Sequence, residues 1–203
     1  MGFYSRYIIP RLTHLSMGQA QLLPYRSRVI EGAKGRVLEI GFGSGRNLPF
    51  YGAAVEEVIG VDVSSEMLAL AAPAVAGSPH KVTLLARSAE SLPFTNRTFD
   101  TVISTWSLCS IPDPAAALRE ARRVLKSHGQ LRFVEHGLSP DPSVSKWQDR
   151  LTPLWCRCAG GCHLNRKTDD LVRIAGFTFA ELSTGYARGL RPMAYMYEGS
   201  VTT

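Results

Sequence analysis

The stretch VLEIGFGSG, residues 37–45, is an apolar run that passes directly into a glycine-rich turn. Glycines suit such a turn because its backbone visits positive φ angles and lets a ligand approach closely. Arg46 stands where the dinucleotide-binding fingerprint G-x-G-x-x-G needs its third glycine, and Glu39 stands two residues before the first. A carboxylate there would repel a pyrophosphate and attract a sulfonium or an amino group. The stretch therefore predicts a buried strand and a ligand-binding loop, and argues against an oxidoreductase.

An acid also ends the second predicted strand. Asp62 follows residues 58–61, about twenty residues after the loop, where a carboxylate can accept both hydroxyls of a ribose. Alternatively, Asp62 could cap the helix expected to begin near Ser65. Two more segments follow in order, RSAESLPF at residues 87–94 and FDTVIS at residues 99–104.

Together these segments resemble the signature of the class I S-adenosylmethionine-dependent methyltransferases, over roughly residues 35–135. The resemblance implies S-adenosylmethionine as the cofactor, with its methionine part on the glycine backbone, its ribose on Asp62 and its adenine beside Met67 and Ala89. Ser88 stands where the family often has Asp. The implied cofactor-binding residues are Glu39, Gly41, Gly43, Gly45, Asn47, Asp62, Val63, Met67, Ser88, Ala89, Glu90 and Thr105.

The pattern of apolar runs and helical segments predicts an α/β fold with a mostly parallel sheet. The last two strands are separated only by residues 186–191, which predicts a C-terminal antiparallel hairpin. The resemblance implies a Rossmann-like sheet of seven strands with helices on both faces, and the chain length and 45% hydrophobic content predict a single domain over residues 1–203. Its expected parts are a helical cap at 1–35, an acceptor-site insertion at 136–176, strands at 36–40, 58–61, 82–86, 101–105, 130–135, 178–185 and 192–198, and helices near 65–76, 114–125, 143–154 and 167–175.

The second half of the chain is similar to a narrower group, small bacterial relatives of the mammalian methyltransferase-like alkyl-thiol methyltransferases. The shared segments include Asn47, Leu108-Cys109-Ser110, Glu135-His136 and Arg166-x-Thr168. This resemblance implies a small hydrophobic acceptor, with a thiol first. The mammalian proteins carry an apolar N-terminal anchor, which we do not expect here because residues 3–9 are amphipathic at best.

His136 is the candidate catalytic proton acceptor, because open α/β sheets bind ligands at the C-terminal edge of their strands. It could equally be a strand-end histidine bonded to backbone. Trp147 and Trp155 could be the buried face of one helix instead of a pocket wall, and Arg166 could form a surface ion pair. The predicted acceptor-binding residues are Trp106, Trp147, Trp155, Cys162 and Arg166.

The run WCRCAGGCH, residues 155–163, offers three thiols and an imidazole, enough ligands for one zinc ion. Its C-x-C spacing differs from the usual C-x2–4-C pair, so we expect no metal site. Cys109 is expected to be a packed thiol near the cofactor. Four cysteines are too few and too unevenly placed for a secreted disulfide framework, which favours a reducing, cytoplasmic location.

The net charge of +6 is concentrated at the N-terminus. Residues 1–36 hold six Lys and Arg against one acid, whereas residues 37–140 hold nine against ten and residues 141–203 hold eight against six. The basic segment could meet the phosphates of a membrane peripherally, or be a solvated helix. The neutral core lacks an aromatic–basic stripe, so we expect no nucleic-acid partner.

Two other functions stay open beside thiol methylation. The first is N-methylation of a phospholipid headgroup or another amine. The second is an RNA- or membrane-binding module that keeps the fold without turnover, against which the intact glycine loop, Glu39 and Asp62 argue. No oligomeric state is predicted.

Overall fold

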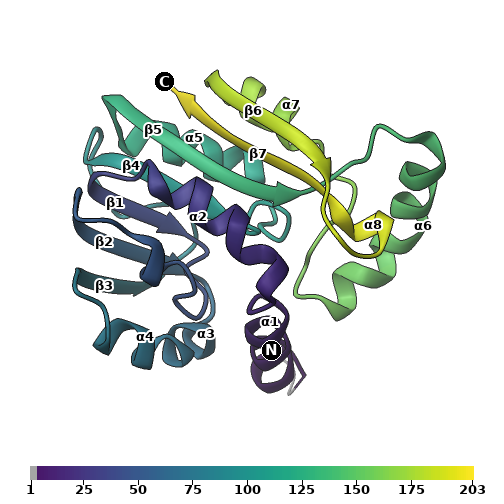
Figure 1. Ribbon diagram of the computed structural model, residues 1–203, viewed down its shortest axis with the longest axis horizontal. Helices are drawn as coiled ribbons and strands as arrows, with labels where there is room; N and C mark the ends of the chain where they lie inside the picture. Colours follow the sequence, from purple (N-terminus) through teal and green to yellow (C-terminus); the bar gives the residue numbers. More distant parts are fainter. Residues whose placement is uncertain (1–3) are drawn as a thin grey trace.

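The computed structural model describes residues 4–203, which form one seven-stranded sheet with the strand order β3-β2-β1-β4-β5-β7-β6 (Figure 1). Strands β1 to β5 are parallel neighbours, and β7 runs antiparallel to both β5 and β6. This confirms the predicted sheet with its C-terminal hairpin. The strands are β1 (Gly35–Ile40), β2 (Val55–Asp62), β3 (Lys81–Ala86), β4 (Phe99–Thr105), β5 (Leu125–His136), β6 (Thr178–Tyr186) and β7 (Tyr195–Thr202).

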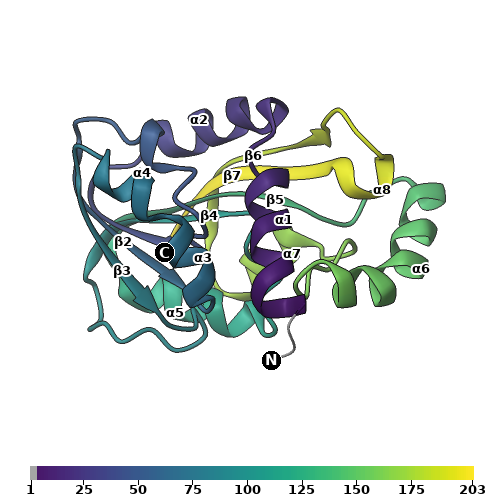
Figure 2. The ribbon, with the colours of Figure 1, turned by 90° about the horizontal axis from the view of Figure 1, so that it is seen from below.

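Helices cover both faces of the sheet, as Figure 2 shows for α2 and α5. On the face of α2, Val29 and Ile30 pack on Val37 and Val58 of the sheet. On the opposite face, α5 and α7 pack over Phe99 and Phe133. The helices are α1 (Ile9–Ser16), α2 (Leu23–Glu31), α3 (Ser65–Leu70), α4 (Ala72–Ala76), α5 (Pro114–Val124), α6 (Pro142–Cys158), α7 (Thr168–Ile174) and α8 (Arg191–Ala194), with single turns η1 (Tyr4–Ile8), η2 (Ala20–Leu22) and η3 (Leu48–Phe50).

Helix α5 shows how the local sequence sets these elements. The Asp113 side chain accepts a hydrogen bond from the Ala116 amide, and Pro114 fills the first helical position, where no intrahelical donor is needed. Its buried side chains recur at helical spacing and form one apolar stripe, Ala117, Leu118, Ala121 and Val124.

Several bounds differ from the prediction: β2 begins at residue 55 and β5 at residue 125, and α6 runs to residue 158. Two further differences have a proline as their cause. The helix expected at 65–76 is split into α3 and α4, because Pro73 has no amide hydrogen to continue the helical hydrogen bonds. The strand expected at 192–198 begins at Tyr195 and runs to Thr202, and residues 191–194 form the one-turn helix α8 instead. Pro192 suits the first turn of a helix and cannot donate to a strand ladder, which explains the later start.

Two segments lie beyond the carboxyl ends of the parallel strands. Helix α1 packs beside α3, and α6 extends past the end of β5 (Figure 1). Among the residues described, no helix is both long and apolar enough to span a bilayer.

Candidate active site

The loop after β1 has the backbone that its glycines predict. The φ angle is +68° at Gly41, +58° at Gly43 and +75° at Gly45, in the left-handed region that glycine favours. A Cβ at Gly41 would overlap the Ser107 hydroxyl, and one at Gly43 would come within 3.3 Å of the Met67 methyl. The loop is therefore packed tightly against the ends of β4 and α3, and only glycine fits at Gly41.

Asp62 joins this loop to the end of β2. One carboxylate oxygen accepts from the Gly43 amide at 2.9 Å and the other from the Ser64 amide at 2.9 Å. Burial raises the pKa of Asp62, and these backbone donors oppose the shift. The cap of α3 is Ser64, whose hydroxyl accepts from Met67, so the capping interpretation of Asp62 is wrong. The Asp62 carboxylate therefore lies beside the glycine loop, where it could accept hydrogen bonds from a ribose.

The segment after β3 is held by a carboxylate of its own. The Ser88 hydroxyl donates to Glu90 at 2.9 Å, and Glu90 accepts from the Asp113 amide at 2.7 Å. Ala89 is buried. Glu90 thus ties this segment to the start of α5, while Val63, directly after Asp62, is 69% exposed and offers an apolar surface to a flat ring.

Glu39 is fully buried beneath the loop. Asn47 donates to one of its oxygens at 2.8 Å and Tyr51 to the other at 2.7 Å. Burial raises the pKa of Glu39 to about 7, which these two donors and the Arg26 charge oppose. Asn47 also donates to the Thr105 hydroxyl at 3.0 Å. Glu39, Asn47 and Thr105 therefore form one support under the cofactor loop.

The sequence prediction missed Arg26, which completes this support from α2. Its guanidinium is 3% exposed and donates to Asn47 at 2.6 Å and to the Met17 carbonyl at 3.1 Å. It also lies 4.8 Å from the Trp106 ring centroid, a cation–π distance. Arg26 follows the spacing of the buried Val29 and Ile30 on α2, and that spacing was the available signal.

Helix α1 is fastened over the glycine loop. His14 Nδ1 lies 2.8 Å from the Ser44 hydroxyl, and Arg46 donates to the His14 carbonyl at 3.0 Å. Burial and the Arg46 charge lower the pKa of His14. The Tyr4 hydroxyl donates to the Cys158 carbonyl at 3.0 Å, so the same segment reaches α6. Arg46, which breaks the dinucleotide fingerprint, thus holds the helix that covers the loop.

The ends of β4 and β5 meet around Glu135. This buried carboxylate accepts from the Ser104 hydroxyl and from the amides of Ser107, Leu108 and Cys109, at 2.9–3.3 Å. Burial raises its pKa against the effect of those donors. Glu135 therefore fixes the loop after β4, and it is fully buried beneath that loop.

His136 and Cys162, predicted separately, lie together with Cys109. His136 Nε2 is 3.0 Å from Cys162 Sγ, and the ligand atoms of all three residues lie within 4.8 Å of one another. His136 Nδ1 is buried without a hydrogen-bond partner among residues 4–203. A hydrogen bond to Cys109 and burial raise the pKa of the Cys162 thiol. A sulfur-rich polar cluster thus stands at the predicted acceptor end of the sheet.

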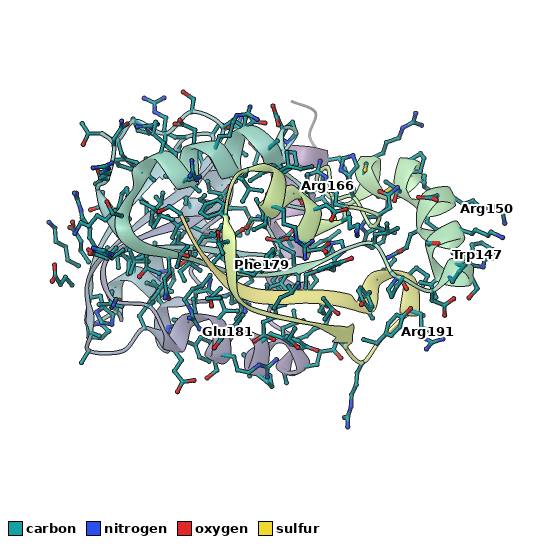
Figure 3. All side chains as sticks on the ribbon, turned by 90° about the horizontal axis from the view of Figure 1, so that it is seen from above. Trp147, Arg150, Arg166, Phe179, Glu181 and Arg191 are labelled. Carbon is teal, nitrogen blue, oxygen red and sulfur yellow. The ribbon has the colours of Figure 1, made fainter. Side chains whose placement is uncertain are left out.

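The other predicted acceptor residues are spread out. Trp106, with φ of +50°, packs against Tyr25 and Arg26 of α2. Arg166 donates to the backbone carbonyls of Leu108 and Ile111, so it braces the loop after β4 and forms no surface ion pair with residues 4–203. Trp147 is 55% exposed on the outer side of α6, beside Arg150 (Figure 3).

Trp155 is half-buried, and its ring nitrogen has no partner in the described part of the chain. The buried positions of α6 are Val144, Gln148 and Thr152. The interpretation that the two tryptophans form the buried face of this helix is therefore wrong.

These residues fit S-adenosylmethionine. The left-handed glycines bring backbone close to a ligand, Asp62 supplies a carboxylate at the ribose position, and Val63 and Ala89 supply apolar surface for the adenine. Neither Glu39 nor Glu135 is exposed, so both act through the backbone and side chains that they hold.

Comparisons with known proteins agree with a site for S-adenosylmethionine. A family model described as a methyltransferase domain matches residues 38–133. The chain is 32% identical over 150 residues to thiol S-methyltransferase TMT1B of Rattus norvegicus, covering 72% of this chain and 61% of that protein. It is 35% identical over 125 residues to phosphatidylethanolamine N-methyltransferase of Cereibacter sphaeroides, covering 60% of this chain and 61% of the relative.

The chain thus spans less than two thirds of each of these relatives. The crystal structure of YcgJ from Bacillus subtilis shares the fold, with a TM-score of 0.67 and 19% identity over 88% of this chain and 96% of that one. The family model shows a methyltransferase domain over residues 38–133, and the strand order, the glycine loop and Asp62 fit the class I S-adenosylmethionine-dependent methyltransferase fold.

Proposed function

We propose that this protein transfers the methyl group of S-adenosylmethionine to a small hydrophobic thiol. The observation that carries the proposal is the cluster at the ends of β4 and β5, which offers sulfur and imidazole groups and no uncommitted carboxylate. An amine acceptor arrives as a cation and would need a carboxylate to bind it before it loses its proton, but Glu135 is fully buried and accepts from four donors of the protein. The similarity to a thiol S-methyltransferase supports the same acceptor.

The reaction depends more on the alignment of the methyl donor with the acceptor than on acid–base groups. The sulfonium of the cofactor supplies an already activated methyl group. The thiol loses its proton to solvent, its sulfur forms a bond to the methyl carbon, and the methyl–sulfonium bond breaks, leaving a thioether and S-adenosylhomocysteine. The glycine loop and Asp62 hold the donor, Glu135 fixes the loop that faces it, and α1 covers the donor side from water.

Methylation should be found with small hydrophobic thiols, and its rate should rise with pH until the thiol in the site is fully deprotonated, because the thiolate is the nucleophile. The measurement is product analysis with methyl-labelled cofactor across thiols, amines, phenols and phospholipid vesicles. If vesicles or amines take up label and no thiol does, the thiol assignment is wrong.

One observation favours the alternative, N-methylation of a phospholipid headgroup. Ile8, Leu12 and Leu15 follow helical spacing at the N-terminal cap and are 38%, 53% and 68% exposed, with the exposed Arg11 among them. An apolar stripe flanked by a cation suits an anionic bilayer surface. We place this second because Glu135, the carboxylate described at the ends of β4 and β5, is fully buried and out of reach of a headgroup amine.

Replacement of Asp62 by Ala should weaken the binding of S-adenosylhomocysteine at least tenfold. The charge-assisted ribose hydrogen bonds are worth roughly 1.5–3 kcal/mol each, and the Gly43 amide also loses its partner. Calorimetry measures the affinity. Glu56→Ala, an exposed position on the same strand, is the control and should bind normally. Unchanged affinity in a folded Asp62→Ala protein would remove Asp62 from the cofactor site.

A further inference from the structure

We propose that Cys109, His136 and Cys162 bind one Zn²⁺ ion and that the thiol acceptor is its fourth ligand. This inference rests on the proposed function and assigns how the thiol is activated. It concerns a different set of residues from the run at 155–163, of which only Cys162 takes part.

The geometry is close to that of a zinc site. In a tetrahedral site with Zn–S near 2.3 Å and Zn–N near 2.0 Å, ligand atoms lie about 3.5–3.8 Å apart. Here the three ligand atoms lie within 4.8 Å of one another, and His136 Nε2 and Cys162 Sγ are 3.0 Å apart. Side-chain shifts of about an ångström would bring all three to bonding distance.

Each ligand is held by the fold. The Cys109 amide donates to Glu135, and its carbonyl accepts from the His163 amide at 2.8 Å, which joins the loop after β4 to the segment after α6. Cys162 follows Gly160 and Gly161, whose φ angles of +63° and +85° make the turn that returns the chain toward β4. His136 is the last residue of β5. Three separate parts of the chain therefore present their ligands to one point.

The surroundings suit a divalent ion with an open position. Cys109 is 3% and Cys162 9% exposed, and two thiolates would cancel the charge of one Zn²⁺ in this buried site. Soft thiolate ligands favour zinc over magnesium or calcium. Zinc sites with three protein ligands and one open position are catalytic, whereas structural sites have four protein ligands.

The cluster is also next to the methyl donor's loop. The Ser107 hydroxyl lies 3.5 Å from the Gly41 carbonyl, and the amides of Ser107 and Cys109 both donate to Glu135. A thiol on the ion would therefore stand beside the glycine loop. On coordination the thiol releases its proton to solvent, since a metal-bound thiol is deprotonated.

The bound sulfur then forms the bond to the methyl carbon as the methyl–sulfonium bond breaks. The neutral thioether that results is a weak ligand and leaves the ion. In this scheme His136 is a metal ligand, and no free base is needed at the thiol.

Zinc binding can be measured directly on the reduced full chain. Titration against a chromophoric zinc chelator should give one equivalent per chain, and Co²⁺ in its place should give a thiolate-to-cobalt charge-transfer band. Cys162→Ser and His136→Ala should each weaken Zn²⁺ binding at least a hundredfold. Cys158→Ser, an exposed thiol outside the cluster, is the matched control and should bind as the wild type does. S-adenosylhomocysteine binding in each variant reports that it is folded.

The outcomes separate the two proposals. Addition of a small thiol should change the Co²⁺ spectrum of the wild type. Less than stoichiometric zinc, or equal binding by wild type and both cluster variants, overturns the metal site, and thiol methylation by that protein would leave the proposed function standing. Stoichiometric zinc in a protein that methylates no thiol upholds the metal site, and overturns the thiol ligand and the proposed function together.

Discussion

Arg26→Ala should lower the free energy of unfolding by about 3–5 kcal/mol, the cost of removing one partner from a buried charged network. The change leaves Asn47 and the Met17 carbonyl without their donor and takes the positive charge away from the buried Glu39. It also removes the cation from the face of Trp106. Burial lowers the pKa of Arg26 only to about 10, so the guanidinium is charged at neutral pH.

Arg28 provides a matched control on the same helix. It forms a two-pronged ion pair with Glu198, but its side chain is 52% exposed. Arg28→Ala should therefore cost about 1 kcal/mol or less. Urea denaturation of both variants measures the difference. Equal losses of stability in the two variants would show that the buried contacts of Arg26 contribute no more than the exposed ion pair of Arg28.

The cofactor half of the site was predictable because its parts are local in sequence. A left-handed glycine turn after a buried strand, and an acid at the end of the next strand, are each visible within a few residues. The parallel sheet then brings Gly43 and Asp62 together at its carboxyl edge, as the structure shows at 2.9 Å. The seven-stranded, mostly parallel sheet followed from the resemblance, and the hairpin from the short connection after residue 185.

The supports of the site were not predictable in this way. Arg26 meets Asn47 across 21 positions in sequence, and Cys109, His136 and Cys162 come together only through the packing of β4, β5 and the turn after α6. The spacing of these three residues matches no zinc motif, so the sequence does not predict that they lie together. Arg166 is predicted to bind the acceptor, but its guanidinium donates to two backbone carbonyls of the loop after β4. Such contacts depend on tertiary packing, which the order of residues does not show.

Glu39 should make the stability of this protein fall as the pH rises from about 4.5 to above 7. Burial raises the pKa of Glu39 from 4.5 to about 7 in the folded chain. A carboxyl with a raised folded pKa contributes stability that is fully present below its unfolded pKa, and that stability is lost as the pH rises through the folded pKa. A shift of this size corresponds to about 3 kcal/mol.

Glu39→Gln keeps an oxygen for Asn47 and a group to meet the Tyr51 hydroxyl, and it cannot ionise. Relative to wild type, the Gln variant should therefore gain about 3 kcal/mol between pH 4.5 and pH 8, measured by urea denaturation at several pH values. Tyr51→Phe removes a donor that favours the carboxylate and so raises the folded pKa of Glu39 further. Its loss of stability should begin at the same pH as in wild type and continue to a higher pH. Parallel pH curves for wild type and Glu39→Gln would mean that Glu39 is ionised throughout this range. Arg26, Asn47 and Tyr51 would then hold a permanent negative charge beneath the cofactor loop.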